Sequence, residues 1–253
     1  MSGIFDLSGK KMVITGGTNG IGRGLVEFFA QQGVDVAAVG SRASSAEKLR
    51  TDMEAKGLKV RSYYMNVRNV PEIQPTIDKI VCDMGGIDIL VCCAGMGNPI
   101  PAIDVTLEDW NEMMDLNTRG TFFSAQAAAK HMLPQKYGRI VIISSQLSVV
   151  ANQDESVYCA SKGAINNLVR ALSYEWSKDG VIVNAVAPTF TYTPGTAERL
   201  DTPAFRDSVL ARIPRGRLCQ ITDIGAAVQY LASDHADMAS GAVLFIDGGW
   251  TTV

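Results

Sequence analysis

Short apolar runs alternate with longer amphipathic stretches along most of the chain. Continuous apolar runs of this length are typical of buried strands. They cover residues 11–15, 34–39, 60–65, 87–93, 139–144, 181–186 and 242–246. Helical patterns lie between them, at about residues 21–32, 44–56, 70–84, 106–133, 157–178 and 222–233. The alternation therefore predicts strands joined by helical crossovers, which is the connection that parallel strands need.

Most of these predicted strands are apolar along both faces, so each face of the sheet needs a covering layer of helices. We therefore expect an α/β fold. It is a single-domain, Rossmann-type doubly wound sandwich, with a seven-stranded parallel sheet flanked by helices over residues 1–253.

One stretch interrupts the alternation. Residues 189–214 contain a loop rich in Thr and then a short helical pattern, after the sixth predicted strand. Ligands bind to such sheets beyond the carboxyl ends of the strands, so an insertion at this edge is placed to act as a substrate lid. The alternative is an ordinary surface loop that does not cover a ligand.

The composition is that of a globular protein with a small ligand. Hydrophobic residues make up 47% of the 253 residues and charged residues 19%, a usual balance for such proteins. A formal net charge of −3 without a Lys/Arg-rich stretch argues against nucleic acid or an anionic membrane as partner. Because no signal-peptide or membrane-span pattern is present, we expect a cytoplasmic protein.

The five cysteines are an odd number without a CxxC pair. We expect them to be small buried hydrophobes, with neither a disulfide framework nor a metal site. Cys92 and Cys93 are adjacent on a predicted strand, so their side chains are expected to point to opposite faces of the sheet.

A glycine-rich turn follows the first predicted strand directly. Residues 15–22 read Thr-Gly-Gly-Thr-Asn-Gly-Ile-Gly and lead into a predicted helix. The first glycine permits a tight exit from the strand, the next lets backbone approach a pyrophosphate, and the last lets the helix pack on the sheet. The helix N-terminus offers unpaired amides to the anion. A dinucleotide is therefore the expected ligand, held by Gly16, Thr18, Asn19, Gly20, Ile21 and Gly22.

The end of the second predicted strand indicates which dinucleotide binds. An acidic residue at this place binds the ribose hydroxyls of NAD, but here Gly40 is followed by Ser41 and Arg42. Ser41 and Arg42 can donate to a 2′-phosphate, so we favour NADP(H) over NAD(H), with a plain surface arginine as the competing explanation. After the third strand, Asn66 is a candidate for binding the adenine edge, with Val67 packed beside it.

Tyr158 and Lys162 lie four residues apart in a predicted helix, which places a phenol beside an ammonium. A free tyrosine titrates near pH 10, and one positive charge about 4 Å away in a shielded site is able to lower that pKa towards neutrality. The pair therefore predicts a proton donor. The alternative is a lysine stem that merely covers a ring.

Together with the strand and helix pattern, these motifs resemble the short-chain dehydrogenase/reductase family from about Leu7 onward. Three departures occur: Cys92-Cys93, Asn66 and Thr189 stand where the family commonly has Asn-Asn, Asp and Gly. None of them falls on the catalytic set. The motifs appear in family order: the glycine turn, Cys-Cys-Ala-Gly at 92–95, Asn117, Ser145, Tyr158 with Lys162, Asn-Ala-Val-Ala-Pro at 184–188 and Asp-Gly-Gly at 247–249.

The resemblance implies an NAD(P)-dependent oxidoreductase that interconverts a secondary alcohol and a ketone by hydride transfer. Tyr158 is then the general acid or base, and Lys162 assists it and holds the nicotinamide ribose. Ser145 donates to the substrate oxygen, and Asn117 holds a water that links Lys162 to solvent. Further cofactor contacts that the resemblance implies are Cys93, Ala94, Gly95, Pro188, Thr191 and Thr193.

Neutral polar side chains around the expected pocket favour a polyhydroxylated substrate. Arg199 or Arg206 in the lid is placed to reach a carboxylate, and several segments are similar to the sugar-acid and polyol branch of the family. A 3-oxoacyl-thioester reductase is the enzymatic alternative, and a dinucleotide-sensing protein is the alternative without turnover. The expected substrate-binding residues are Ser145, Gln146, Gln153, Tyr158 and Thr189.

The resemblance also implies a homotetramer. Its contacts are expected from the predicted helices at residues 106–133 and 157–178 and from the last strand.

Overall fold

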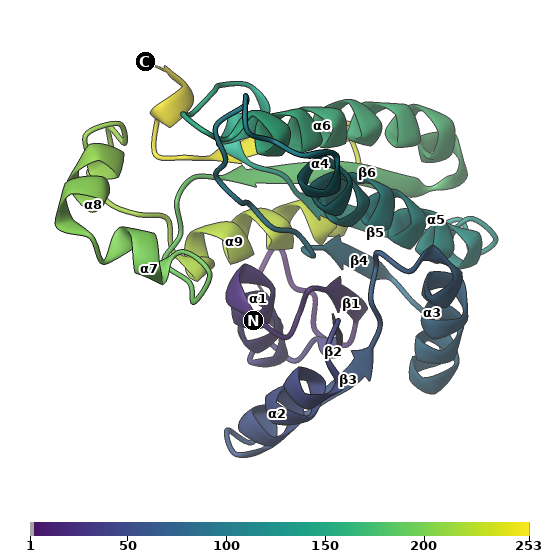
Figure 1. Cartoon of the computed structure of the whole chain (residues 1–253). Helices are drawn as coiled ribbons and strands as arrows, with labels where there is room; N and C mark the ends of the chain where they lie inside the picture. The colour runs from purple at the N-terminus through teal and green to yellow at the C-terminus, as the bar shows by residue number, and fades with distance from the viewer. Residues whose placement is uncertain (1–2, 253) are drawn as a thin grey trace.

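The computed structural model describes residues 3–252, which build one seven-stranded parallel sheet (Figure 1). The strand order is β3-β2-β1-β4-β5-β6-β7, so the direction of winding reverses between β1 and β4. This confirms the predicted fold class, although residues 1–2 and 253 of the predicted domain lie outside the described part. The strands are β1 (Lys11–Thr15), β2 (Asp35–Gly40), β3 (Val60–Tyr64), β4 (Ile89–Cys92), β5 (Gly138–Ile143), β6 (Val181–Pro188) and β7 (Val243–Ile246).

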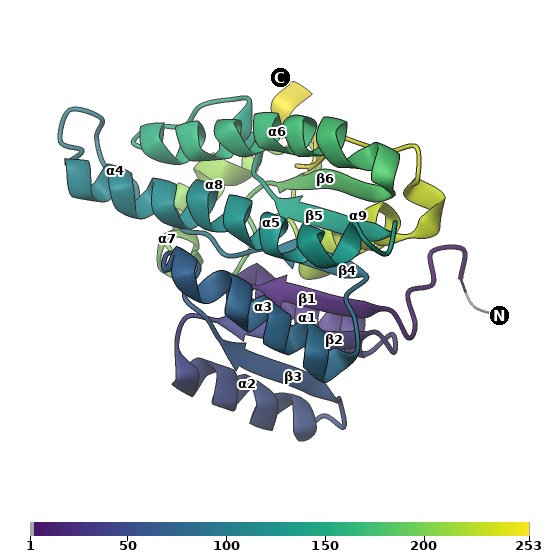
Figure 2. The ribbon, with the colours of Figure 1, turned by 90° about the vertical axis from the view of Figure 1, so that its right-hand side faces the viewer.

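Helices cover both faces of the sheet. Figure 2 views the molecule from the side of α3, α5 and α6, which lie in front of the strands. Helices α1, α2 and α9 pack on the opposite face. These main helices are α1 (Gly20–Ala30), α2 (Ala43–Glu54), α3 (Val70–Met84), α4 (Leu107–Met114), α5 (Gly120–Met132), α6 (Ser156–Trp176) and α9 (Ile221–Ala232).

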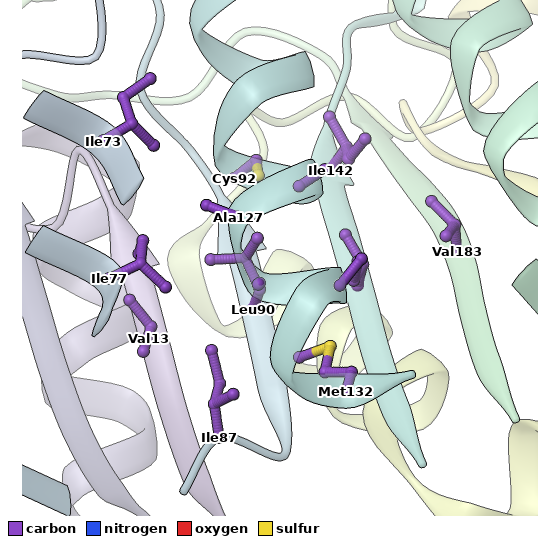
Figure 3. Close-up of a cluster of buried hydrophobic side chains, with 14 of the residues drawn as sticks. Val13, Ile73, Ile77, Ile87, Leu90, Cys92, Ala127, Met132, Ile142 and Val183 are labelled. Carbon is purple, nitrogen blue, oxygen red and sulfur yellow. The ribbon is translucent and has the colours of Figure 1, made fainter. Parts of the chain in front are cut away.

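Neighbouring residues of each central strand enter two separate cores. In β4, Leu90 and Cys92 point towards α3, α5 and α6 (Figure 3), whereas Ile89 and Val91 point towards the other layer. Cys93 packs against that second layer, which confirms that Cys92 and Cys93 face opposite sides. Each buried Leu or Ile contributes about 1.5–3 kcal/mol of hydrophobic stabilisation.

The expectation that the cysteines are buried is confirmed for Cys92 and Cys219 and wrong for Cys82, which is exposed on α3, while Cys93 and Cys159 are partly buried. The buried stripe of this helix is formed by Ile73, Ile77, Ile80 and Met84. Helical spacing places Cys82 on the opposite, solvent-facing side of that stripe.

The helix predicted at residues 106–133 is interrupted. Its first part is α4, its second part is α5, and the five residues Asp115–Arg119 between them form a π-helical turn. Such turns widen a helix locally and are frequent at functional sites. This turn carries the buried Asn117.

Residues 189–214 leave the sheet and form α7 (Ala197–Leu200) and α8 (Pro203–Leu210), which project to the left in Figure 1. A small core of Leu200, Val209, Ile213 and Trp250 holds this segment. Since Trp250 lies close to the C-terminus, the end of the chain supports the projecting segment.

No helix between residues 3 and 252 combines the length and apolar character that a bilayer crossing needs. Over the same residues, no three His, Cys, Asp or Glu side chains are grouped so that they could hold a metal ion.

Candidate active site

The residues predicted to be catalytic come together beyond the carboxyl end of β5. Ser145 follows that strand, Asn117 lies in the π-helical turn, and all but Tyr158 are at most 6% exposed. Because α6 begins at Ser156, Tyr158 lies in its first turn and Lys162 follows one turn later on the same side. The Lys162 Nζ is 5.8 Å from the centroid of the Tyr158 ring.

The Lys162 ammonium is buried and held by backbone. Its Nζ donates a hydrogen bond of 2.9 Å to the carbonyl oxygen of Ile143. A Cβ added to Gly95 would lie 3.5 Å from this Nζ and 3.2 Å from the Asn117 Oδ1, so the loop after β4 passes directly over both groups. Burial lowers the pKa of Lys162 to about 8.

The pKa of Tyr158 moves in the direction opposite to the predicted one. Burial raises it to about 12, the Ser145 hydroxyl opposes this rise, and the Glu155 carboxylate adds to it. The prediction that Lys162 alone brings Tyr158 near neutrality is therefore wrong. Desolvation disfavours the phenolate, and the Lys162 Nζ donates to the Ile143 carbonyl.

Asn117 ties the loop after β4 to helix α6. Its Oδ1 accepts from the Met96 amide at 2.9 Å. Its Nδ2 donates to the Met96 carbonyl at 2.9 Å and to the Ser161 hydroxyl at 3.0 Å. Both side-chain protons are thus engaged within the protein, and the role of Asn117 in holding a water stays a prediction.

The side chains of Ser145 and Gln146, which follow the carboxyl end of β5, are hydrogen-bonded to each other. The Ser145 hydroxyl accepts from the Leu147 amide and donates to the Gln146 Oε1, each at 3.1 Å. Gln146 is only 2% exposed and so lies within the site, whereas Gln153 is exposed on the following loop. The structure therefore brings Gln146, but not Gln153, next to Ser145.

The glycine turn touches the backbone that follows β4. Gly16 has a φ of +68°, and a Cβ there would lie 2.7 Å from the Ala94 Cα. A Cβ on Gly22 would overlap the Gly16 carbonyl oxygen, so helix α1 is packed against its own entry turn. The Asn19 Oδ1 caps α1 by accepting from the Gly20 amide at 2.9 Å. Thr18 and Ile21 flank these residues at the helix N-terminus, where an anion is favoured.

The end of β2 lies beside the same turn. A Cβ on Gly40 would overlap the Thr18 hydroxyl, which gives a steric reason for glycine there. Ser41 and Arg42 follow as exposed residues at the start of α2, and the Arg42 side chain makes no capping hydrogen bond. Arg42 thus follows the end of β2, where the ribose site is predicted, with an exposed side chain.

Asn66 and Val67 follow β3. The Asn66 Oδ1 accepts from the Arg68 amide at 3.1 Å, which fixes the turn. Val67 is buried, and a Cβ on Gly120 would lie 2.8 Å from its carbonyl oxygen.

The segment after Pro188 returns to the glycine turn. A Cβ on Gly20 would lie 3.8 Å from the Thr193 Cβ, so the two ends of the predicted cofactor site meet there. Thr191 is buried and donates to the Thr189 carbonyl at 3.1 Å. The Thr189 hydroxyl is itself buried without a hydrogen-bond partner among residues 3–252.

Glu155 is a site residue that the sequence pattern did not single out. It is 5% exposed, precedes Tyr158 by three residues, and its Oε1 lies 3.2 Å from the Nη1 of Arg199 in α7. Burial raises the pKa of Glu155, and Arg199 opposes that rise. The only sequence signal was an acidic residue just before the helix that carries Tyr158. Arg199, expected to reach a substrate carboxylate, is therefore paired within the chain.

Comparisons with known proteins show which proteins the chain is similar to. Residues 16–251 match a family model described as enoyl-(acyl carrier protein) reductase. The chain is 34% identical over 248 residues to gluconate 5-dehydrogenase of Gluconobacter oxydans (strain 621H), covering 98% of this chain and 97% of the relative. It is 36% identical over 247 residues to D-threitol dehydrogenase of Mycolicibacterium smegmatis (strain ATCC 700084 / mc(2)155), covering 98% and 95%. A crystal structure of a gluconate 5-dehydrogenase from Burkholderia cenocepacia J2315 in complex with NADP and tartrate has a TM-score of 0.94, 31% identity and 98% coverage of both chains.

Proposed function

Because this chain belongs to the short-chain dehydrogenase/reductase family, in its sugar-acid and polyol dehydrogenase branch, we propose that Tyr158, Lys162, Ser145 and Asn117 are its catalytic set. The protein is an NAD(P)-dependent oxidoreductase that interconverts secondary alcohols and ketones. The observation that carries the assignment of roles is the convergence of Ser145, Tyr158 and Lys162 in one partly desolvated site behind β5.

Tyr158 moves the proton in this reaction. The nicotinamide, when bound, supplies or accepts the hydride. In carbonyl reduction the Tyr158 hydroxyl donates its proton to the substrate oxygen, and in alcohol oxidation the phenolate accepts that proton. The Ser145 hydroxyl donates to the same oxygen and stabilises the negative charge that develops on it. Lys162 binds the nicotinamide ribose and favours the phenolate, while Asn117 connects Lys162 to solvent through a water.

The residues around the glycine turn fit a dinucleotide. The close approach of Gly16 to Ala94 leaves no room for a side chain, and the α1 N-terminus offers amides to a pyrophosphate. The remaining contacts that we assign to the cofactor are Thr18, Asn19, Gly20, Ile21, Gly22, Ser41, Arg42, Asn66, Val67, Cys93, Gly95, Pro188, Thr191 and Thr193.

Within this NAD(P) site we favour NADP. Gly40 leaves the end of β2 without a carboxylate, and Arg42 is exposed beside it. The related gluconate 5-dehydrogenase structure contains NADP. A guanidinium suits a 2′-phosphate because it donates several hydrogen bonds from a fixed plane.

Residues 189–214 act as the substrate lid in this proposal. They follow Pro188, the last residue of β6, and Arg199 of α7 reaches back to Glu155 next to Tyr158. The lid and the polar residues Gln146, Gln153 and Thr189 then bound the pocket for a sugar acid or a polyol.

A second copy of the chain covers the face formed by α4, α5 and α6. A shallow hollow of about 550 Å³ lies between these helices, lined by Met114, Phe122, Leu168 and Ala171 among others. Trp110 of α4 is 43% exposed beside this face. We propose that such contacts, together with those of β7, build a homotetramer.

The deciding experiment follows reduced-nicotinamide absorbance with a panel of polyols, sugar acids and 3-oxoacyl thioesters, each with NAD and NADP. Tyr158→Phe should lower kcat by about 100-fold or more while cofactor binding persists. Retained turnover in this variant contradicts the assigned role. Preferred turnover of the thioesters would instead support the acyl reductase, and bound cofactor without any turnover would support a sensor.

A further inference from the structure

The Glu155–Arg199 pair lies beside Tyr158, and both Glu155 and the Tyr158 ring border Gly97. Glu155 is 5% exposed and Arg199 38% exposed by side chain, and their facing atoms are 3.2 Å apart. Arg199 also stacks on Phe205, with its guanidinium carbon 4.5 Å from the ring centroid. The pair therefore joins the lid to the first turn of α6.

The second oxygen of Glu155 faces the same space as the Tyr158 ring. A Cβ added to Gly97 would lie 3.8 Å from the Glu155 Oε2 and 3.4 Å from the Tyr158 Cδ2. Oε2 has no hydrogen-bond donor among residues 3–252, yet it is not sealed from solvent as the Thr189 hydroxyl is. An ionised carboxylate oxygen only accepts hydrogen bonds, so it suits a hydroxyl on a ligand and repels a carboxylate.

Among the described lid residues, no cation is free to bind a ligand carboxylate beside Glu155. The Arg199 guanidinium is already engaged by the Glu155 Oε1 at 3.2 Å, which leaves the Glu155 Oε2 without a donor from the lid. Arg212 is exposed, stacks over Trp250 at 4.2 Å and donates to the Asn152 Oδ1 at 3.2 Å. Arg206 is exposed on α8. The Lys162 ammonium is directed at a backbone carbonyl. A buried substrate carboxylate would thus meet Glu155 without a free partner, which is unfavourable.

We propose that Glu155 selects neutral polyols over sugar acids, an inference that rests on the proposed function. Its Oε2 accepts hydrogen bonds from substrate hydroxyls near the reacting carbon, and its Oε1 keeps Arg199 from recruiting a carboxylate. Glu155 is then a specificity-determining residue, with neutral polyols as the expected class of substrate.

The test compares substrates that share a carbon chain and differ in the charged end. D-threitol is paired with D-threonate and D-glucitol with D-gluconate, and kcat/KM is measured for each with the preferred cofactor. The wild-type protein should favour the polyol of each pair it oxidises by at least tenfold, because a buried charge without a partner is strongly unfavourable. Glu155→Gln removes the negative charge and releases Arg199, so this ratio should move towards the acid by at least tenfold.

Two further variants distinguish an effect of the Glu155 charge from a general loss of folded protein. Arg199→Gln leaves Glu155 without its partner, so turnover of the acid should fall further relative to the polyol. Arg217→Gln removes a cation outside the lid, where Arg217 pairs with Asp223, and should leave the ratio within about threefold, which is about 0.65 kcal/mol. Cofactor binding, followed by fluorescence, reports whether each variant is folded.

A wild-type preference for the acids, or an unchanged ratio in a folded Glu155→Gln variant, overturns the proposal. If the Glu155→Gln variant does not bind cofactor, the Arg199→Gln variant provides the test. An unchanged ratio of kcat/KM for polyol and acid in Arg199→Gln also overturns the proposal. Absence of turnover with every alcohol and ketone instead overturns the proposed function and, with it, this selectivity. The two failures are therefore distinguished by whether any substrate of the panel reacts.

Discussion

Burial moves both Tyr158 and Lys162 towards their neutral forms, with a pKa of about 12 for the phenol and about 8 for the ammonium. A phenol of this kind keeps its proton at neutral pH and is suited to donate it to a carbonyl oxygen. The charge of Lys162, in contrast, is lost as the pH rises through about 8.

These two values predict different pH profiles for the two directions of reaction. Alcohol oxidation needs the phenolate, and a phenol with a pKa of about 12 is only slightly ionised at neutral pH, so kcat for oxidation should rise with pH throughout the range from about 6 to about 9. Carbonyl reduction needs the phenol, so its kcat should stay level up to about pH 8 and fall above it as Lys162 loses its charge. Initial rates in both directions over this range are the measurement. Oxidation that slows as the pH rises towards 8 would contradict the role of Tyr158.

Arg42 should determine the preference between cofactors. Hydrogen bonds to charged groups contribute about 1.5–3 kcal/mol, so Arg42→Ala should lower kcat/KM for NADP by about 10- to 100-fold and leave NAD nearly unchanged. Lys48→Ala is the control, because this lysine lies on the same helix but pairs with Asp52 at 3.4 Å. An equal fall in kcat/KM for NAD and NADP in Arg42→Ala would mean that Arg42 does not bind the 2′-phosphate.

The sequence was sufficient to place Tyr158 and Lys162 on one side of a helix, because that relation depends on local spacing alone. It was insufficient for the direction of the Tyr158 pKa, which depends on how deeply the surrounding loops bury the ring. Glu155 was missed for a related reason, since its partner Arg199 lies 44 residues further along the chain.

The glycine turn is the element whose packing tolerates least change. Gly22→Ala would force a Cβ into the Gly16 carbonyl oxygen, so it should lower the free energy of unfolding by about 1–3 kcal/mol and weaken cofactor binding. Gly195→Ala is the matched control, because a Cβ there would meet nothing closer than 3.9 Å. Chemical denaturation and cofactor titration measure the two effects. Equal stability of both variants would show that the turn relaxes freely.

The π-helical turn makes a separate prediction. Asn117→Ala removes three hydrogen bonds that hold Met96 and Ser161, so it should reduce the free energy of unfolding by about 1–3 kcal/mol. Because Met96 follows Gly95, which covers Lys162, kcat should fall as well. Denaturant unfolding and steady-state kinetics check both results. Wild-type kinetics in this variant would contradict a positioning role for Asn117.

Regular elements were predicted well where one periodicity governs them: β1 and α3 have the bounds that the pattern indicated. The π-helical turn was not visible, since residues 106–133 read as one continuous helix. A widened turn depends on tertiary contacts, such as those between Asn117 and the loop after β4.

At the scale of the whole molecule, the alternation of strands and helices predicted the parallel sheet and its two covering layers. The support of the projecting segment by Trp250 was not predicted, because Trp250 lies far from α8 in the chain and meets it only in the folded protein.

The proposed assembly predicts a particle with the mass of four chains by light scattering. Leu168→Glu places a charge in the hollow between α5 and α6, so it should yield smaller species. Lys59→Glu, on an exposed residue before the edge strand β3, should leave the assembly intact. A wild-type monomer at micromolar concentration would contradict the tetramer.

Trp250 packs with Leu200 and Val209 of the projecting segment, whereas the described chain enters β1 at the amino ends of the strands, the opposite edge of the sheet (Figure 2). An affinity tag or fusion partner joined next to Trp250 would therefore lie against the segment that we propose as the substrate lid. The same addition at the N-terminus would leave that segment untouched. Purification schemes and immobilised preparations of this protein should for this reason be built from the N-terminal end.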